Sequence, residues 1–147
     1  MKIVILGAGV VGAQIASQLT GEGHDVVIIE KNPETAKHVA NHVDCIVIND
    51  EGNNSATLKR AGIENADFFL SVVDSDEVNM IACGIVESEF RVPVKIARVR
   101  NLDYSRAKLF EKSFLGIDFV VNPEVETARL IANTVALGAT SDVMLFE

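Results

Sequence analysis

The sequence predicts an α/β fold built on a doubly wound parallel sheet, and three observations lead to it. Short apolar runs alternate with amphipathic, helix-like segments along the whole chain. The apolar runs are nearly continuous in Val, Ile, Leu and Phe, which is typical of parallel strands covered on both faces. A glycine-rich turn at residues 7–12 follows the first run and opens a helical pattern. We therefore expect a Rossmann fold with six main strands in the order 3-2-1-4-5-6.

The predicted elements follow one another with short connections. The strands are residues 2–6, 25–30, 44–48, 68–73, 94–99 and 119–121. The helices are residues 10–20, 33–41, 55–61, 76–89, 103–115 and 123–137. Asn32 is a suitable N-cap for the second helix, and Pro33 suits its first turn. Gly62, Gly116 and Gly138 each follow a helical pattern and indicate where that helix stops.

Composition and charge exclude several classes of protein. The net charge of −8 argues against binding to a nucleic-acid backbone or to an anionic membrane surface. No apolar run approaches the roughly 20 residues of a membrane-spanning helix. The apolar start runs directly into the glycine turn, which favours a buried strand over a secretion signal. Cys45 and Cys83 lack metal-ligand spacing, so we expect reduced core residues of a cytosolic protein.

The length of 147 residues suits one domain with a single core. We assign residues 1–138 to this domain. Beyond Gly138, the segment Ala139-Thr140-Ser141 has the composition of a loop, and the apolar residues 143–146 resemble the opening of another strand. We therefore expect residues 139–147 to begin a following domain that is missing from this chain.

The glycine-rich turn predicts a phosphate site. Gly7 permits the tight turn, Gly9 lets the backbone approach a pyrophosphate, and Gly12 lets the helix pack closely on the sheet. Free N–H groups and the helix dipole then hold the phosphates. The alternative is a tight turn that binds no ligand. The residues predicted to form this site are Gly7, Ala8, Gly9, Val10, Val11 and Gly12.

Glu30 is the candidate acid for an adenosine ribose. It ends the second predicted strand and lies 21 residues after Gly9, close to the usual interval of about 20. Its carboxylate can accept both ribose hydroxyls, whereas a 2′-phosphate would meet like charge, so NADP should be disfavoured. The neighbouring Lys31 reduces this effect slightly. The alternative is a solvated strand end without a ligand.

Other motifs are more specific than the glycine turn. They are Leu58-Lys59-Arg60-Ala61-Gly62-Ile63, Ala66-Asp67, Asp76-Glu77-Val78-Asn79-Met80, Ile96-Ala97-Arg98-Val99, Tyr104, Gly116-Ile117-Asp118 and Pro123-Glu124. A chain that carries them in this order resembles the RCK or KTN family, the TrkA N-terminal type of domain. Members of this family are regulatory nucleotide-binding modules of potassium channels and transporters. The resemblance covers essentially the whole chain.

This resemblance implies a domain that performs no chemistry. Such domains bind NAD, NADH, ATP or ADP and pass the state of the site to a membrane pore. For this chain, the resemblance implies a regulatory subunit of a potassium-uptake system whose partner is a Trk-type potassium-transporting membrane subunit. It also implies a homodimer or larger homo-oligomer, located in the cytoplasm at the inner face of the membrane.

Further site residues carry over from the family one at a time. Asp50 and Glu51 stand near the adenine, where the family usually has a Gly-Asp or similar pair. Val73 and Asp74 end the fourth predicted strand at the switch point, near the nicotinamide or a terminal phosphate. Arg98 matches a family arginine that can meet phosphates, although an ion pair with Asp74 is an open alternative. Some relatives have Arg or Gln at the position of Val10, and these side chains can bind a terminal phosphate directly. Val10 cannot make this contact.

The main alternative is an NAD-dependent oxidoreductase domain without its substrate domain. Tyr104 and Lys108 have the YxxxK spacing of short-chain dehydrogenases, in which the lysine lowers the phenol pKa. The glycine spacing and the position after the fifth strand oppose this, and we predict no catalytic residues. His38 and His42 lie four apart and could bind a metal. Because no third ligand completes the set, we predict no metal site.

Overall fold

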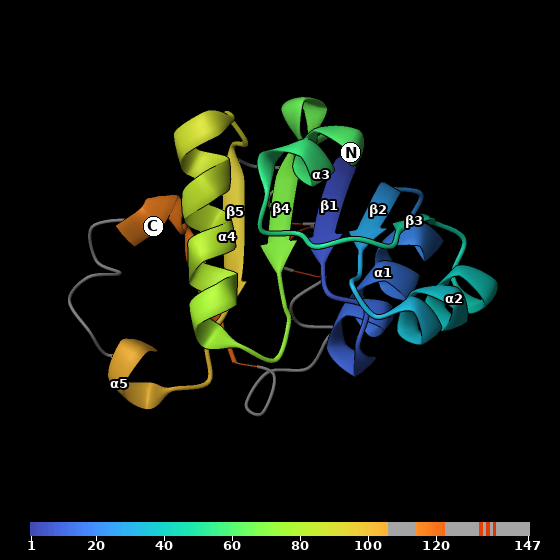
Figure 1. Cartoon of the computed structure of the whole chain (residues 1–147), viewed down its shortest axis with the longest axis horizontal. Coiled ribbons are helices and arrows are strands. Elements are labelled where there is room, and N and C mark those ends of the chain that lie inside the picture. The colour runs from blue at the N-terminus through green and yellow to red at the C-terminus, as the bar shows by residue number, and fades with distance from the viewer. Residues whose placement is uncertain (106–113, 123–132, 134, 136, 138–147) are drawn as a thin grey trace.

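The computed structural model describes residues 1–105, 114–122, 133, 135 and 137. Its centre is a six-stranded sheet in which every pair of neighbours is parallel, and the arrows of β1 and β4 in Figure 1 point the same way. The predicted fold class and strand order are confirmed. In sheet order, the strands are β3 (Ile46–Ile48), β2 (Asp25–Ile29), β1 (Lys2–Leu6), β4 (Phe68–Ser71), β5 (Val94–Arg98) and β6 (Phe119–Val121).

Helices alternate with these strands, and several begin as the sequence predicts. Asn32 caps the second helix, because its Oδ1 accepts the N–H groups of Glu34 and Thr35, each at 3.0 Å. Gly62 ends the third helical segment with a φ of 80°. The helices are α1 (Val10–Gly21), α2 (Pro33–His42), α3 (Ser55–Arg60), α4 (Asp76–Glu89) and α5 (Leu102–Ser105), with 3-10 turns η1 (Ile63–Asn65) and η3 (Phe114–Gly116).

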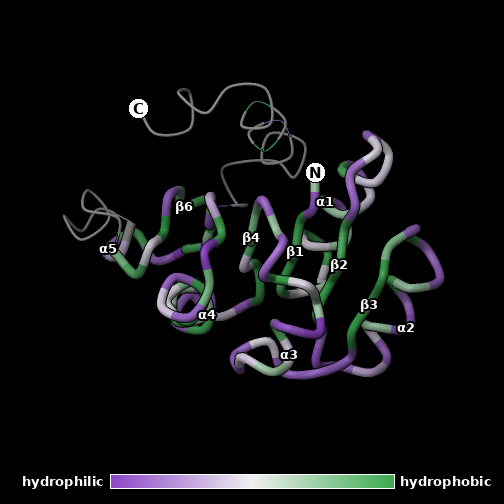
Figure 2. The backbone as a smooth tube through the Cα atoms, turned by 90° about the horizontal axis from the view of Figure 1, so that it is seen from above, coloured by the Kyte–Doolittle hydropathy of each residue, from purple (hydrophilic) through white to green (hydrophobic). Residues whose placement is uncertain are grey.

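Two hydrophobic layers cover the sheet, one on each face. On one face, Ile15 and Leu19 of α1 and Val39 of α2 are fully or almost fully buried against the strands. On the other face, Leu58 of α3 and Val86 of α4 are completely buried. Figure 2 shows α3 and α4 together on one side of the row of strands, whose tubes are mostly hydrophobic. This double cover explains why the strands are continuously apolar.

β2 and β5 each end one residue earlier than predicted, and β3 and β4 are each two residues shorter, for reasons in the local hydrogen bonding of the latter two. The third strand begins at Ile46 instead of residue 44, because the Cys45 N–H turns back to the Val43 carbonyl at 2.9 Å. The fourth strand ends at Ser71 instead of residue 73. There, the side chain of Asn79 forms hydrogen bonds with both the N–H and the carbonyl oxygen of Val73, so these groups do not pair with a neighbouring strand.

The predicted helix 103–115 is wrong at its end. Leu115 has a left-handed φ of 54° inside the η3 turn, so the chain is not α-helical there, and residues 106–113 lie outside the described part. Of the predicted helix 123–137, only residues 133, 135 and 137 are described, and they are helical. The predicted start of a following domain at 139–147 lies outside the described residues. Among the described residues, no helix has the length and apolarity to span a membrane.

Candidate functional site

A cavity of about 630 Å³ opens at the carboxyl edge of the sheet, at the boundary between the half formed by β1, β2 and β3 and the half formed by β4, β5 and β6. This is the position at which the strand order reverses, and ligands of open α/β sheets bind at such a switch point. The lining residues are Leu6, Gly7, Gly9, Val10, Val11, Ile29, Glu30, Lys31, Thr35, Asp50, Glu51, Gly52, Asn53, Val72, Val73, Asp74, Ser75, Val78 and Arg98.

Most of the predicted site residues therefore line one cavity, although they come from five separate segments of the chain. Two of them do not line it. Ala8 is buried, with 4% of its surface exposed, and Gly12 packs beneath the turn. Lining residues that the sequence analysis did not assign to the site include Thr35, Asn53 and Val78. Their signal was available, since each lies within a few residues of a strand's carboxyl end.

The three glycines of the turn differ in what requires them. Gly7 has a φ of 108°, which favours glycine, and an added Cβ would press against Val73. At Gly12, an added Cβ would overlap the carbonyl oxygen of Gly7. Gly9 has an ordinary φ of −66°, and an added Cβ would meet no atom within 4 Å. The fold therefore requires Gly7 and Gly12, whereas no contact within the described part of the chain requires Gly9.

The first turn of α1 lacks the side-chain cap that the other long helices have. Asn32 caps α2 and Ser75 caps α4, whereas the N-cap of α1 is Gly9, with no side-chain hydrogen bond and no acid in its first turn. The first N–H groups of a helix have no partner within it and attract anions. Gly9, Val10 and Val11 line the cavity, so these donors lie beside it.

Glu30 directly follows β2 and faces the glycine turn. Its Oε1 accepts the Ala8 N–H at 2.8 Å, and its Oε2 accepts the Asn32 N–H at 2.9 Å. Each carboxylate oxygen has more than one acceptor position, so both oxygens keep capacity for a ligand hydroxyl. The carboxylate is thus held in one orientation at the cavity wall, which suits a ribose site.

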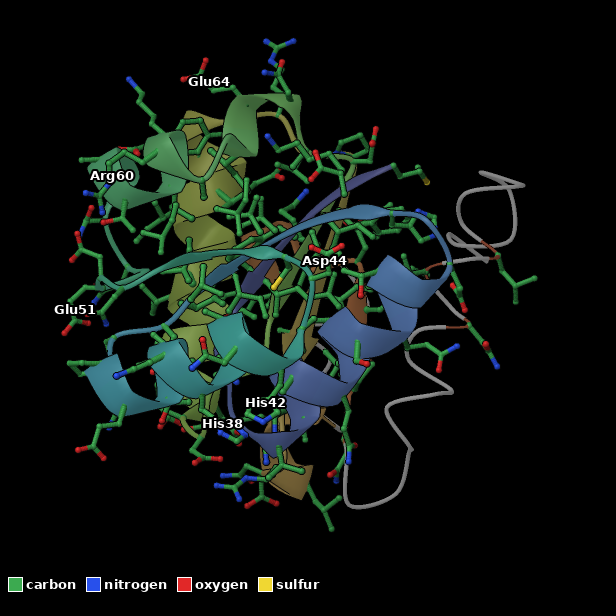
Figure 3. All side chains as sticks on the ribbon, turned by 90° about the vertical axis from the view of Figure 1, so that its right-hand side faces the viewer. His38, His42, Asp44, Glu51, Arg60 and Glu64 are labelled. Carbon is green, nitrogen blue, oxygen red and sulfur yellow. The ribbon has the colours of Figure 1, made fainter. Side chains whose placement is uncertain are left out.

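A short loop before α3 forms the next part of the wall. The Asp50 carboxylate accepts the Glu51 N–H at 2.7 Å and pairs with Arg60 at 2.6 Å. The hydrogen bond from the Glu51 N–H lowers the pKa of Asp50 below its usual value, and the Arg60 side chain lowers it further by a smaller amount. Glu51 and Arg60 lie on the same side of the molecule in Figure 3. At Gly52, an added Cβ would overlap Leu6, so this loop approaches β1 only with glycine there.

Arg98 and Asp74 occupy the opposite wall. Arg98 Nη1 lies 3.0 Å from Asp74 Oδ1 and 3.4 Å from the carbonyl oxygens of Val72 and Val73. The ion pair between Arg98 and Asp74, which the sequence left as an open alternative, is therefore present in this structure. The Nε atom of Arg98 is buried and has no hydrogen-bond partner among the described residues. A largely buried arginine with an unused donor beside a cavity fits a ligand that offers a hydrogen-bond acceptor.

Asn79 of α4 is a positioning residue that the sequence analysis did not identify. It is completely buried, and its Oδ1 accepts the Ser71 hydroxyl at 3.0 Å and the Val73 N–H at 2.9 Å. Its Nδ2 donates to the carbonyl oxygens of Val73 and Arg98, both at 2.9 Å. Asn79 therefore holds the carboxyl ends of β4 and β5 together beneath the cavity. A polar residue on the inward face of a predicted helix was the available signal.

The residues of the enzyme alternative do not form an acid–base site in the described part. A hydrogen bond between the Tyr104 phenol and the Glu77 carboxylate raises the pKa of Tyr104, with the charge of Glu77 as the next cause. A dehydrogenase requires the opposite shift. Lys108 lies outside the described residues. The His38 and His42 rings stack at 4.2 Å between centroids on the exposed side of α2, and no group of three metal-ligating side chains occurs among the described residues.

The fold and the cavity define a class, the Rossmann-type domain with a glycine-rich turn at the switch point. Residues 3–123 match the family model of the TrkA-N domain. The chain belongs to the TrkA-N family.

Curated relatives agree with this assignment. The Trk system potassium uptake protein TrkA of Azorhizobium caulinodans is 36% identical and aligns with 99% of this chain but with only 32% of its own length. A TrkA homolog of Methanothermobacter thermautotrophicus is also 36% identical, over 99% of this chain and 65% of its own length. The chain therefore spans about a third of the bacterial relative.

Solved structures share the fold at low sequence identity. The TrkA-N domain of the inner membrane protein ybaL from Escherichia coli has a TM-score of 0.73 and 19% identity, over 90% of this chain and 94% of that chain. The GsuK channel bound to NAD has a TM-score of 0.70 and 20% identity, over 82% and 21%. GsuK bound to ADP has a TM-score of 0.69 and 20% identity, over 82% and 31%.

Proposed function

We propose that this chain is the nucleotide-binding domain of a regulatory subunit in a potassium-uptake system. It binds NAD or NADH, with ATP or ADP as the alternative ligand, and performs no chemistry. Family membership and the names of the curated relatives support the assignment to potassium uptake. The second candidate, an oxidoreductase domain, has less support because the only acid–base pair in its favour includes a tyrosine whose pKa is raised.

The observation that carries the nucleotide site is the open space around Gly9. Packing and a positive φ account for Gly7 and Gly12, but none of the described residues occupies the position of a Cβ at Gly9. A ligand pyrophosphate that approaches the backbone there supplies the missing reason for glycine. The donors of α1 and the carboxylate of Glu30 flank this space.

The proposed ligand contacts follow the cavity wall. Gly7, Gly9, Val10 and Val11 hold the phosphates, Glu30 and Lys31 meet the ribose, and Asp50 and Glu51 lie near the adenine. Val73, Asp74 and Arg98 meet the remaining half of the ligand. Ala8 contributes indirectly, because its N–H orients Glu30, and Gly12 maintains the turn. GsuK, which shares the fold, has been solved with NAD and with ADP, so this fold can hold either ligand.

Regulation requires that the ligand bind two arrangements of the assembly with different affinity. The cavity lies between the two halves of the sheet, so a ligand that contacts both halves favours their closed arrangement. We propose that this change passes to a Trk-type membrane subunit, that the regulatory subunit forms a homo-oligomer, and that it lies in the cytoplasm against the inner face of the membrane through that partner.

Calorimetric titration of the purified chain with NAD, NADH, ATP and ADP tests the proposal. At least one ligand should bind, and Gly9→Asp should abolish binding because a carboxylate adds bulk and repulsion at the pyrophosphate position. Gly21→Asp is the matched control, since Gly21 also has open space around it and lies at the other end of α1. Unchanged affinity in a folded Gly9→Asp variant would overturn the phosphate-site assignment.

A further inference from the structure

The far end of the cavity contains one cationic side chain, and an acid already holds it. Among the described lining residues, the cations are Lys31, which follows Glu30 on the ribose side, and Arg98 at the end of β5. Arg98 Nη1 lies 3.0 Å from Asp74 Oδ1. The two side chains differ greatly in exposure, 12% for Arg98 and 91% for Asp74. The guanidinium is therefore fixed in the wall, while its carboxylate partner stands in solvent at the cavity mouth.

We infer that Asp74 is a specificity-determining residue, which makes the far end of the cavity unsuitable for terminal phosphates and so favours dinucleotides over ATP and ADP. This inference rests on the proposed function. A terminal phosphate that binds Arg98 must displace the Asp74 carboxylate or lie beside it. Displacement breaks the Arg98–Asp74 ion pair, and a phosphate beside the carboxylate meets a like charge at short range, so both arrangements are unfavourable.

Two apolar side chains at the mouth support the same conclusion. Val10, in the first turn of α1, is 75% exposed, and Val78, in the first turn of α4, is 38% exposed. Both line the cavity, and neither offers a hydrogen-bond donor. An apolar wall is suited to the ring and sugar faces of a second nucleotide half, and it gives a polyphosphate no compensation for lost hydration.

The anchoring of Arg98 explains why Asp74 controls its charge. The Arg98 guanidinium also contacts the carbonyl oxygens of Val72 and Val73, and its own carbonyl is held by Asn79. Since these contacts are independent of Asp74, removal of the carboxylate should leave the guanidinium in place. Its positive charge then becomes available to the cavity, where a phosphate can form charge-assisted hydrogen bonds.

The test is the variant Asp74→Asn, titrated with ATP, ADP, AMP and NAD by calorimetry without magnesium and at fixed ionic strength. The ratio of ATP affinity to AMP affinity should rise about tenfold over wild type, equivalent to about 1.4 kcal/mol. AMP has no terminal phosphate to reach Arg98, so its affinity should change little. Glu64→Gln is the matched control, because it removes one exposed carboxylate at the end of the molecule where the strands begin (Figure 3).

A double variant separates the Arg98–Asp74 pair from a general change in charge. In an Arg98→Met background, Asp74→Asn should no longer raise the ATP-to-AMP ratio. An unchanged ratio in Asp74→Asn, or an equal rise in the Arg98→Met background, would overturn the inference while AMP binding shows that the site itself exists. If wild-type protein binds neither AMP nor NAD, the proposed function fails and this inference fails with it.

Discussion

The two edges of the sheet carry cavities of similar volume, but the cationic side chains beside them differ in how fully the protein pairs them. The cavity at the carboxyl edge has a volume of about 630 Å³, and a second cavity at the amino edge has about 600 Å³. At the amino edge, the buried ammonium of Lys95 lies 2.9 Å from Glu87 and 3.7 Å from Asp118, and donates to the Val92 carbonyl at 2.8 Å. At the carboxyl edge, Arg98 has a buried Nε without a partner among the described residues.

Volume alone therefore does not separate a ligand site from a structural hollow. At the amino edge, the Asp118 carboxylate also accepts the Lys95 N–H at 2.8 Å, so the charges of Lys95, Glu87 and Asp118 all have partners within the protein. The carboxyl edge keeps unused donors and a glycine, Gly9, that packing does not require. Incomplete satisfaction by the protein's own described groups is what distinguishes the proposed ligand site.

The largest expected effect tests the structural role of the amino edge. Lys95→Met should lower the free energy of unfolding by about 3 kcal/mol, because it leaves the largely buried Asp118 carboxylate without its cation, while Glu87 is exposed enough for water to compensate it. Urea denaturation measures this loss, and nucleotide affinity of the folded variant should stay unchanged because the ligand site is at the opposite edge. Lys2→Met is the control on β1, where the lysine is only partly buried, and it should cost less than about 1 kcal/mol. Equal losses in the two variants would contradict the role assigned to Lys95.

The next prediction separates Gly12, which packing requires, from Gly9, which packing among the described residues does not require. Gly12→Ala should cost about 1–3 kcal/mol of stability, because its Cβ overlaps the Gly7 carbonyl oxygen. Gly9→Ala should change stability by less than about 1 kcal/mol yet weaken nucleotide binding. Thermal unfolding and calorimetric titration of both variants check the two halves of this prediction. The distinction fails if Gly9→Ala destabilises the fold as much as Gly12→Ala.

A comparable effect concerns the choice of ligand at Glu30. Wild-type protein should bind NADH more tightly than NADPH by a factor on the order of tenfold to a thousandfold, since a 2′-phosphate loses a hydrogen bond and meets like charge. Glu30→Gln should narrow this difference and also weaken ATP and ADP, which carry the same ribose hydroxyls. Competition titrations measure the ratios. Equal affinity of wild-type protein for NADH and NADPH would make Glu30 a strand end without a ligand role.

The smallest effect asks whether the carboxyl edge contains acid–base chemistry. Tyr104 is the only tyrosine and the chain has no tryptophan, so ultraviolet absorbance during alkaline titration reports this phenol alone. Its midpoint should lie above the usual value of about 10, because Glu77 raises the pKa of Tyr104. Glu77→Gln should lower the midpoint toward that of the urea-unfolded chain. A wild-type midpoint below 10 would revive the dehydrogenase alternative.

The sequence was sufficient for the features that depend on local chemistry. Continuous apolar runs predicted the parallel sheet, the side chain of Asn32 predicted a helix start, and the glycine spacing predicted the turn. Features that depend on distant neighbours were out of reach. Asn79 holds a carbonyl 19 residues away at Arg98, and the left-handed Leu115 packs against Gly84 of α4. Such partners become adjacent only when the sheet has formed, so no pattern along the chain encodes them plainly.

The position of β1 has a consequence for the kinetics of folding. β1 pairs with the nearby β2 on one side, but on the other side Ile3 pairs with Phe68 of β4, far along the chain. Pairings between distant segments form slowly, because closing a long loop costs entropy before any contact between the segments stabilises it. Until β4 docks, β1 presents an unpaired row of N–H and C=O groups that another chain can join. Refolding at high protein concentration should therefore lose material to aggregation during this interval, before the nucleotide cavity exists.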